Sequence, residues 1–317
     1  HSSGNQIKYI TSHEPVNPNF LLKRSVDFMQ KYIELLRKPM QVKPESLRAA
    51  RQKSSSTPPH VYRLNYNESP YGLGPLSEEA LEKAIKTPYV YPDWFSVELK
   101  TNIAKLYDLD FENVVVGPGS SAMINMLGEL FINPGDEFIF GDPSYEAFRD
   151  VANDYGAVTV PVPLDDDMNY DLDAMLAAVT DKTKILVVVN PNNPTGTFID
   201  SKKLEDFIRK VPKHVITVID EAYLEFVTDE NCYSMLKLIK EGIDKPLVIM
   251  KTFSKIYGMA GLRVGYAITD PVMADHFGKS SNAWNVSFIG QKTAAAATLD
   301  QEHVSMVKNI NAQERDK

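Results

Sequence analysis

The chain has 317 residues and only one cysteine, Cys232, so it can form no disulfide bond within itself. It contains no run of about 18 apolar residues of the kind that spans a bilayer, and no charged-then-apolar leader precedes the domain. The formal net charge of -8 argues against a nucleic-acid partner, because surfaces that bind phosphate backbones carry a basic excess. These absences favour a cytoplasmic protein that acts on small molecules.

Two nucleotide-binding motifs are also missing. No G-x-x-x-x-G-K-[ST] sequence occurs, so the chain lacks the usual loop for a triphosphate. A loop at residues 117–119 departs from the G-x-G-x-x-G pattern because Ala122 stands at the third glycine position. A nucleotide-binding protein that uses this loop in another way stays open as an alternative, and it would bind ATP without a yellow colour.

The order of apolar and amphipathic stretches predicts an α/β protein. Short apolar runs alternate with stretches of helical periodicity, which is typical of a mostly parallel sheet with helices on both faces. We expect strands near Glu137–Phe140, Thr183–Val189 and Leu247–Met250, helices near Ser77–Lys86, Phe95–Tyr107 and Ser201–Lys210, and one long helix from Ile289 to Asn311.

The stretch KTFSKIYGMAGLRVGY, residues 251–266, carries the most chemical information. It places Lys255 just after a short apolar strand, among Thr252, Ser254, two glycines and Arg263. A lysine can act as an amine nucleophile when its charge is suppressed and an anion is held nearby. Pyridoxal 5'-phosphate, with an aldehyde and a phosphate, meets both needs when it forms a Schiff base with the lysine. The alternative is an ordinary solvated lysine.

Two further strand ends deliver polar side chains. In VVVNPNNPTG, residues 187–196, a turn-forming cluster follows the strand, and the amide of Asn193 could bind an anionic ring oxygen. In HVITVIDEAYLEF, residues 214–226, Asp220 ends a strand and Tyr223 follows three residues later. An aspartate there can keep a pyridine nitrogen protonated, and the tyrosine can bond to the ring oxygen. The alternatives are a plain strand-to-helix turn and a metal ligand.

A fourth segment predicts a phosphate site. ENVVVGPGSSAMINMLGELF, residues 112–131, is a strand, a glycine loop and an amphipathic helix that begins near Ser120 and Ser121. Free backbone N–H groups and the helix dipole favour an anion at such a helix start, and the serine hydroxyls add donors. A glycine loop by itself discriminates poorly between ligands.

Together these segments resemble the fold-type I pyridoxal-phosphate enzymes, and most closely the class I and II aminotransferases of the histidinol-phosphate aminotransferase type. The resemblance spans about Arg63 to Asn309, with the four motifs in the family's order. It implies a three-layer α/β sandwich with a mostly parallel sheet, and a small domain formed by the N-terminal segment and a C-terminal part outside this sequence. It also implies a homodimer with pyridoxal 5'-phosphate as cofactor and no metal.

The resemblance assigns roles to particular residues. Lys255 would be the Schiff-base lysine, Asp220 the partner of the pyridine nitrogen, and Asn193 and Tyr223 the ligands of the ring oxygen. The catalytic set is then Lys255, Asp220 and Tyr223. The phosphate would be held by Ser120, Ser121, Thr252, Ser254 and Arg263.

Four more segments match the family, and two positions depart from it. DPSYEAF places Tyr145 against the cofactor ring, and LNYNESPYG places Tyr71 where it would reach the phosphate of the neighbouring subunit. YVYPD and NVS match as well. Relatives usually have an acidic residue where Ser121 or Ala122 stands. They tend to have Pro-Phe where this chain has Ala283-Trp284, a difference that would alter a wall of the substrate site.

The domain organisation follows from the resemblance and from composition. Residues 1–4 are typical of a tag remnant, residues 5–62 form an extension, residues 63–288 the large cofactor-binding domain, and residues 289–317 a helix leading to the small domain. In the extension, Phe20–Arg37 predicts an amphipathic helix capped by Asn19, equally compatible with core packing and a subunit contact. Gln52–Pro59 predicts a linker.

The expected reaction is the transfer of an amino group from an amino acid or an amino-alcohol phosphate, such as histidinol phosphate, to a 2-oxo acid. Lys255 would move the α-proton after the substrate displaces it from the cofactor. A decarboxylase or oxidase of the same fold is the enzymatic alternative, because the protein selects which bond breaks. A cofactor-binding regulatory module without turnover is the other. The sequence does not identify the amino donor.

Overall fold

The computed structural model describes residues 64–281 and 284–317. The expected helix at Phe20–Arg37, its cap Asn19, the linker at Gln52–Pro59 and Ala283 lie outside these residues. The boundaries proposed for the tag remnant and the extension also fall outside them.

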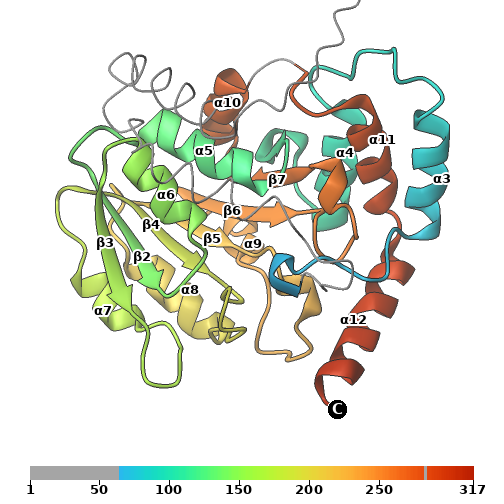
Figure 1. Cartoon of the computed structure of the whole chain (residues 1–317). Helices are drawn as coiled ribbons and strands as arrows, with labels where there is room; N and C mark the ends of the chain where they lie inside the picture. The colour runs from blue at the N-terminus through green and yellow to red at the C-terminus, as the bar shows by residue number, and fades with distance from the viewer. Residues whose placement is uncertain (1–63, 282–283) are drawn as a thin grey trace, which may run out of the picture. The chain divides into compact units, whose positions relative to one another are not determined.

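The described residues form a chain of alternating helices and strands (Figure 1). The strands are β1 (Val114–Gly117), β2 (Glu137–Asp142), β3 (Val158–Pro163), β4 (Thr183–Val189), β5 (Ile216–Asp220), β6 (Leu247–Thr252) and β7 (Gly265–Ile268). The α-helices are α3 (Pro75–Ala84), α4 (Val97–Tyr107), α5 (Ser120–Phe131), α6 (Ala147–Asp154), α7 (Leu172–Ala177), α8 (Ser201–Lys210), α9 (Leu236–Lys240), α10 (Pro271–Ser280), α11 (Phe288–Ala297) and α12 (Gln301–Arg315).

The seven strands make one sheet in the order β1-β7-β6-β5-β4-β2-β3. β2, β3, β4, β5 and β6 pair in parallel, whereas β7 is antiparallel to both of its neighbours. The expectation of a mostly parallel sheet is therefore confirmed. The carboxyl ends of β4, β5 and β6 lie side by side, which is where open α/β sheets bind ligands.

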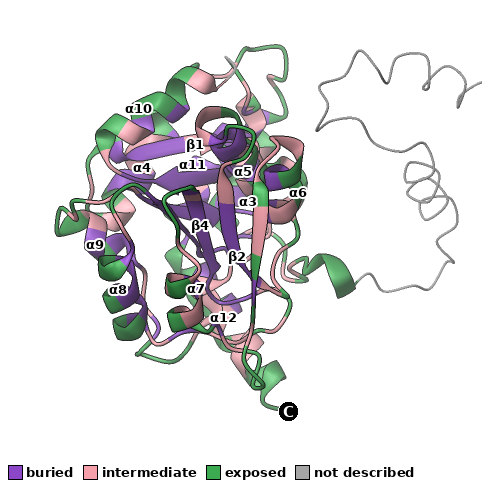
Figure 2. Cartoon of the chain, turned by 90° about the vertical axis from the view of Figure 1, so that its left-hand side faces the viewer, coloured by how far each residue is buried: buried purple, intermediate pink, exposed green. Residues whose placement is uncertain are grey.

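The central strands are apolar on both faces because each face is covered by helices. Alternate residues of β4, such as Val187 and Val188, enter two separate hydrophobic cores. One core includes residues of α5, α6 and α10, and the other includes residues of α4, α7, α8, α9, α11 and α12. In Figure 1, α5, α6 and α10 lie above the sheet, and α7 and α8 lie below it. In Figure 2 the central strands are buried while the edge strand β3 and the outer helix faces are largely exposed. The expected three-layer sandwich is confirmed.

The helix expected from Ile289 to Asn311 is wrong in one respect, because the chain forms two helices, α11 and α12, that are interrupted at residues 298–300. The interruption includes Asp300, whose carboxylate caps the start of α3. Its Oδ2 accepts hydrogen bonds from the backbone N–H groups of Leu76 at 3.0 Å and Ser77 at 3.3 Å. This contact joins residues more than 220 positions apart, so local periodicity gives no sign of it.

Other boundaries agree with the expectations to within a few residues. α8 begins at Ser201 because the Asp200 side chain accepts a hydrogen bond from the Lys203 N–H, which satisfies one of the free donors at the helix start. Within residues 64–281 and 284–317, no helix has the length and apolar character needed to cross a membrane.

Candidate active site

Three neighbouring strands bring the predicted polar residues together. In the register of the sheet, Val189 at the end of β4 lies beside Asp220 at the end of β5, and Asp220 lies beside Met250 of β6. Because the strands are parallel, the segments that follow them leave from one edge of the sheet. Asn193 and Lys255 lie on two of these segments, so residues 62 positions apart in sequence meet at one place.

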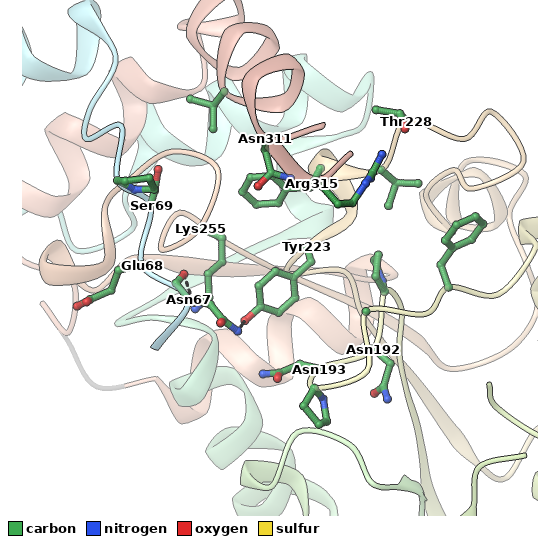
Figure 3. Close-up of a pocket in the computed structure, with 18 of the residues that line it drawn as sticks. Asn67, Glu68, Ser69, Asn192, Asn193, Tyr223, Thr228, Lys255, Asn311 and Arg315 are labelled. Atoms are coloured by element: carbon green, nitrogen blue, oxygen red, sulfur yellow. Dashed lines mark hydrogen bonds between the residues drawn. The ribbon is translucent and has the colours of Figure 1, made fainter. Parts of the chain in front are cut away.

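A cavity of about 320 Å³ lies at this edge. Of the eleven residues predicted to bind the cofactor, ten line it. They are Ser120, Ser121, Tyr145, Asn193, Asp220, Tyr223, Thr252, Ser254, Lys255 and Arg263. The eleventh, Tyr71, instead lines a neighbouring cavity of about 680 Å³ that also contacts Lys255, Asn193 and Tyr223 (Figure 3).

Asp220 is the buried acid of the site. Its side chain is 2% exposed, and its Oδ1 accepts a hydrogen bond of 3.0 Å from the Ala222 N–H. Burial raises the pKa of this carboxyl from its ordinary 3.8 to about 6. The Ala222 hydrogen bond and the charges of Lys251 and Lys255 lower the pKa, but by less than burial raises it. A cation placed against Asp220 in the cavity would therefore favour the ionised carboxylate.

Lys255 holds its amino group in the cavity next to Tyr223. Its Nζ donates hydrogen bonds to the carbonyl oxygens of Tyr66 at 2.9 Å and Asn67 at 3.3 Å. The same nitrogen lies 5.3 Å from the centre of the Tyr223 ring. The hydroxyl of Tyr223 in turn accepts a 3.1 Å hydrogen bond from Asn67 Nδ2. The segment before α3 therefore lies across both side chains (Figure 3).

Lys251, four residues earlier, is held in a different way. Its Nζ lies 3.2 Å from a carboxylate oxygen of Glu221 and 2.8 Å from one of Glu225. Burial alone would lower the pKa of Lys251, but Glu225, Tyr107 and Glu221 together hold that pKa well above its usual value. Lys251 thus remains a charged ammonium ion. Lys255 is the lysine of this stretch that faces the cavity.

The glycine loop and Arg263 form the anion-binding end. Gly119 is the N-cap of α5, with a φ of 85°, and Ser120 and Ser121 are the first residues of that helix. Arg263 Nη1 donates to the carbonyl oxygen of Ala260 at 3.0 Å and lies 3.4 Å from Ser254 Oγ. A Cβ at position 119 would lie 2.4 Å from Arg263 Nη2, so glycine is required for this close approach. The helix start, the hydroxyls and the guanidinium suit a phosphate.

Tyr145 completes one wall of the cavity from the loop between β2 and α6. Its ring packs edge-on against Phe148, with 6.2 Å between ring centres and an interplanar angle of 84°. The phenol ring thereby has a fixed orientation and can present a flat surface to a planar ligand.

Several residues of the site were missed by reasoning from the sequence. Asn67 binds Tyr223, and the buried Glu221 and Lys251 tie the segment after β5 to β6. Tyr170 donates a hydrogen bond to Asn192, which lies in the loop after β4. The sequence gives a weak signal for Asn192, which stands in the turn-forming cluster before Asn193. It gives none for Tyr170, because its partners are distant in sequence.

The fold and the cavity together define the class of protein, namely an α/β protein with a lysine, a buried acid and an anion site at one sheet edge. Residues 59–316 match the family model described as aminotransferase class I and II. The chain therefore belongs to the class I and II aminotransferase family. The family predicted from the sequence is confirmed.

Individual relatives agree with this assignment. The chain is 37% identical over 256 residues to the histidinol-phosphate aminotransferase of Moorella thermoacetica, covering 81% of this chain and 66% of that protein. It is also 37% identical over 247 residues to the corresponding protein of Akkermansia muciniphila, covering 78% of this chain and 67% of that protein. The chain thus spans about two thirds of the length of these relatives.

Solved structures are similar as well. Histidinol-phosphate aminotransferase from Sinorhizobium meliloti, in complex with pyridoxal-5'-phosphate, has a TM-score of 0.76 at 28% identity, covering 97% of this chain and 77% of that chain. The enzyme of the same name from Clostridium acetobutylicum has a TM-score of 0.69 at 26% identity, covering 77% of this chain and 71% of that one. The large-domain fold expected from the sequence is therefore the observed one.

Proposed function

We propose that this protein is a pyridoxal-phosphate-dependent aminotransferase. The observation that carries the proposal is the single cavity in which Lys255, the buried Asp220 and the anion-binding end at Arg263 meet. A lysine amine, an acid and a phosphate site at one sheet edge match the aldehyde, the pyridine nitrogen and the phosphate of this cofactor. The family and the relatives support the same conclusion.

The residues of the cavity fit the cofactor by their chemistry. Burial raises the pKa of Asp220, so a cationic ring nitrogen opposite it would stabilise the ionised carboxylate. Asn193 and Tyr223 would donate to the ring oxygen, and Tyr145 would lie against the ring face. The phosphate would be held by Ser120, Ser121, Thr252, Ser254 and Arg263. When bound, the cofactor supplies an aldehyde that condenses with amines and a ring that accepts electrons.

Side chains of this protein would then transfer the proton of the substrate α-carbon. The Nζ of Lys255 would take a proton from the substrate α-carbon and deliver it to the carbon that carried the cofactor's aldehyde. The amine must be uncharged when it takes the proton. Its hydrogen bonds to the carbonyl oxygens of Tyr66 and Asn67 orient the nitrogen within the cavity. Asp220 would stay ionised throughout, because its cationic partner is present in each half of the reaction.

We propose an amino acid or amino-alcohol phosphate as the amino donor and a 2-oxo acid as the acceptor. Histidinol phosphate is the first donor to test, because the relatives at 37% identity carry that name. The neighbouring cavity of about 680 Å³, which contacts Lys255 and extends to Phe198, Phe226 and Arg315, has room for a side chain beyond the reacting carbon.

The test is a coupled assay of the protein with pyridoxal 5'-phosphate, 2-oxoglutarate and either histidinol phosphate or a panel of amino acids. A transaminase forms one glutamate for each donor consumed, and this result is expected. A decarboxylase would release carbon dioxide, an oxidase would consume dioxygen, and a regulatory module would bind the cofactor without turnover. Any of these three outcomes, with no glutamate formed, would overturn the proposal.

We further propose that the protein acts as a homodimer in the cytoplasm. A group of aromatic side chains is exposed on one surface, with Tyr91 at 76% and Trp94 at 56% exposure. Trp284 packs against both, at ring-centre distances of 5.0 Å and 4.8 Å, and lines neither cavity of the site. Exposed apolar groups of this kind mark protein interfaces. Sedimentation of the wild type and of Trp94→Ser would test the dimer, and a monomeric wild type would contradict it.

A further inference from the structure

The hydroxyl of Tyr170 lies at a junction of three segments, two of which carry residues that line the cavity. It is 2.9 Å from Ser144 Oγ and 3.2 Å from Asn192 Oδ1, and it accepts a 3.1 Å hydrogen bond from the Val189 N–H. Tyr170 itself is 8% exposed. Burial raises the pKa of Tyr170 to about 12, so the hydroxyl keeps its proton at neutral pH.

The partner amide, Asn192, uses all of its hydrogen-bonding capacity. Its Oδ1 accepts from Ser144 Oγ at 2.7 Å and from Tyr170, while its Nδ2 donates to the Pro143 carbonyl at 3.1 Å and to Thr195 Oγ1 at 3.0 Å. Asn192 is 3% exposed. A buried amide with every partner in place has a single favourable position.

The hydrogen-bond partners of Tyr170 stand next to predicted cofactor-binding residues in the sequence. Ser144 is directly followed by Tyr145, and Asn192 is directly followed by Asn193. The Tyr170 ring packs so closely on β2 that a Cβ at Gly141 would lie 2.3 Å from it. The ring is therefore fixed by the sheet, and its hydroxyl contacts the two loops that carry Tyr145 and Asn193, which line the cavity.

We propose that Tyr170 is a positioning residue, whose hydroxyl sets the position of Tyr145 relative to Asn193 across the cofactor site. This proposal rests on the proposed function, since it concerns how the cavity receives pyridoxal 5'-phosphate. Tyr170→Phe keeps the ring against Gly141 and removes only the hydroxyl. The Val189 N–H and the Ser144–Asn192 pair then lose a buried partner, which loosens both loops.

The first measurement uses the cofactor-free protein and so does not depend on the proposed function. Amide hydrogen exchange of residues 141–146 and 189–197 is expected to be at least about 10-fold faster in Tyr170→Phe. The matched control is Tyr233→Phe, which removes a hydroxyl that donates to Glu205 Oε1 at 2.5 Å, outside the residues that line either cavity. That variant is expected to exchange like the wild type in both loops.

The second measurement compares the affinity for pyridoxal 5'-phosphate and the pH dependence of the visible absorbance of the loaded protein. Tyr170→Phe is expected to bind the cofactor about 10-fold more weakly and to shift the pH midpoint of the absorbance, because Asn193 would bind the ring oxygen less well. Tyr233→Phe should do neither. Unchanged exchange in both loops, or faster exchange with cofactor affinity and midpoint equal to wild type, would overturn the role of Tyr170. A wild type without affinity for the cofactor would instead refute the proposed function, while the exchange data would still show whether Tyr170 couples the loops.

Discussion

The side-chain nitrogen of Lys255 lies 5.3 Å from the centre of the Tyr223 ring, and the Tyr223 hydroxyl is bound by Asn67. The amine and the phenol therefore share one cavity, although they come from segments after different strands. Lys251 lies within β6, four residues before Lys255, and its ammonium group is paired with the carboxylates of Glu221 and Glu225. This difference between two lysines of one motif explains why only Lys255 can reach a cofactor in the cavity.

Replacing Lys255 by alanine tests that assignment. Because the amine is both the point of attachment and the proton carrier, Lys255→Ala is expected to lower turnover by on the order of 10⁴-fold or more and to abolish the visible absorbance change on addition of pyridoxal 5'-phosphate. Absorbance spectra and a glutamate assay measure the two effects. Lys279→Ala, at a surface lysine with 69% side-chain exposure, should behave like the wild type. Full activity in Lys255→Ala would refute the role.

Asp220→Asn tests the buried acid through the pH dependence of stability. The folded-state pKa of about 6 lies above the ordinary 3.8, so the folded protein holds a proton that the unfolded chain releases between these values. The contribution of Asp220 to the free energy of unfolding is therefore complete below about pH 4. It is lost as the pH rises through about 6, and the loss amounts to about 3 kcal/mol. Without cofactor, Asp220→Asn should be more stable than wild type at pH 7.5 by up to this amount.

Urea unfolding of both proteins at pH 4 and at pH 7.5 measures this difference, and Asp166→Asn, in an exposed loop, serves as the control. A gap between wild type and Asp220→Asn that is equal at the two pH values would contradict the raised pKa. With cofactor present, Asp220→Asn should be less active than the wild type, although it is more stable without cofactor. The reason is that an amide cannot neutralise a pyridinium nitrogen. Glutamate formation by Asp220→Asn is expected to fall by at least about 100-fold.

The site residues that stand directly after the carboxyl ends of strands can be predicted from the sequence. Apolar β-branched runs ending in polar residues predict strand ends, and parallel pairing places those ends at one edge, so the pattern of residues alone groups Asn193, Asp220 and Lys255. The fold class follows from the same alternation. Glycine and serine at a helix start similarly indicate the anion site.

The supporting contacts could not be predicted in this way, because they join residues that are distant in sequence and have no periodic signal. Asp300 caps α3 from the other end of the described chain, and it lies where the helix that Ala-rich periodicity predicted is interrupted. Tyr170 reaches three segments through one hydroxyl. Side-chain direction decides such contacts, and spacing along the chain does not contain it.

Removing Lys251 should destabilise the protein without touching the cavity. Lys251→Met would leave Glu221, which is 2% exposed, without its cationic partner, and an uncompensated buried charge of this kind costs about 3 to 5 kcal/mol. Adding Glu221→Gln should recover part of the loss, because the unpaired carboxylate is then gone. Denaturant unfolding measures both variants. Lys213→Met, which breaks an exposed pair with Asp244, should leave the stability nearly unchanged, because water screens such pairs. A loss for Lys251→Met as small as that of Lys213→Met would show that the buried pair is unimportant.

Gly119→Ala should weaken the anion-binding end through one clash. The new methyl group would lie 2.4 Å from Arg263 Nη2 and would push the guanidinium away from the start of α5. The dissociation constant for pyridoxal 5'-phosphate is expected to rise by at least about 10-fold, since a charge-assisted contact to phosphate is lost. The constant for pyridoxal, which has no phosphate, should change little. Gly135→Ala is the matched control, because Gly135 also has a positive φ of 95° but no atom near the added methyl group. If both glycine variants weaken the phosphorylated and unphosphorylated ligands alike, backbone strain alone explains the effect and Arg263 is not the phosphate ligand.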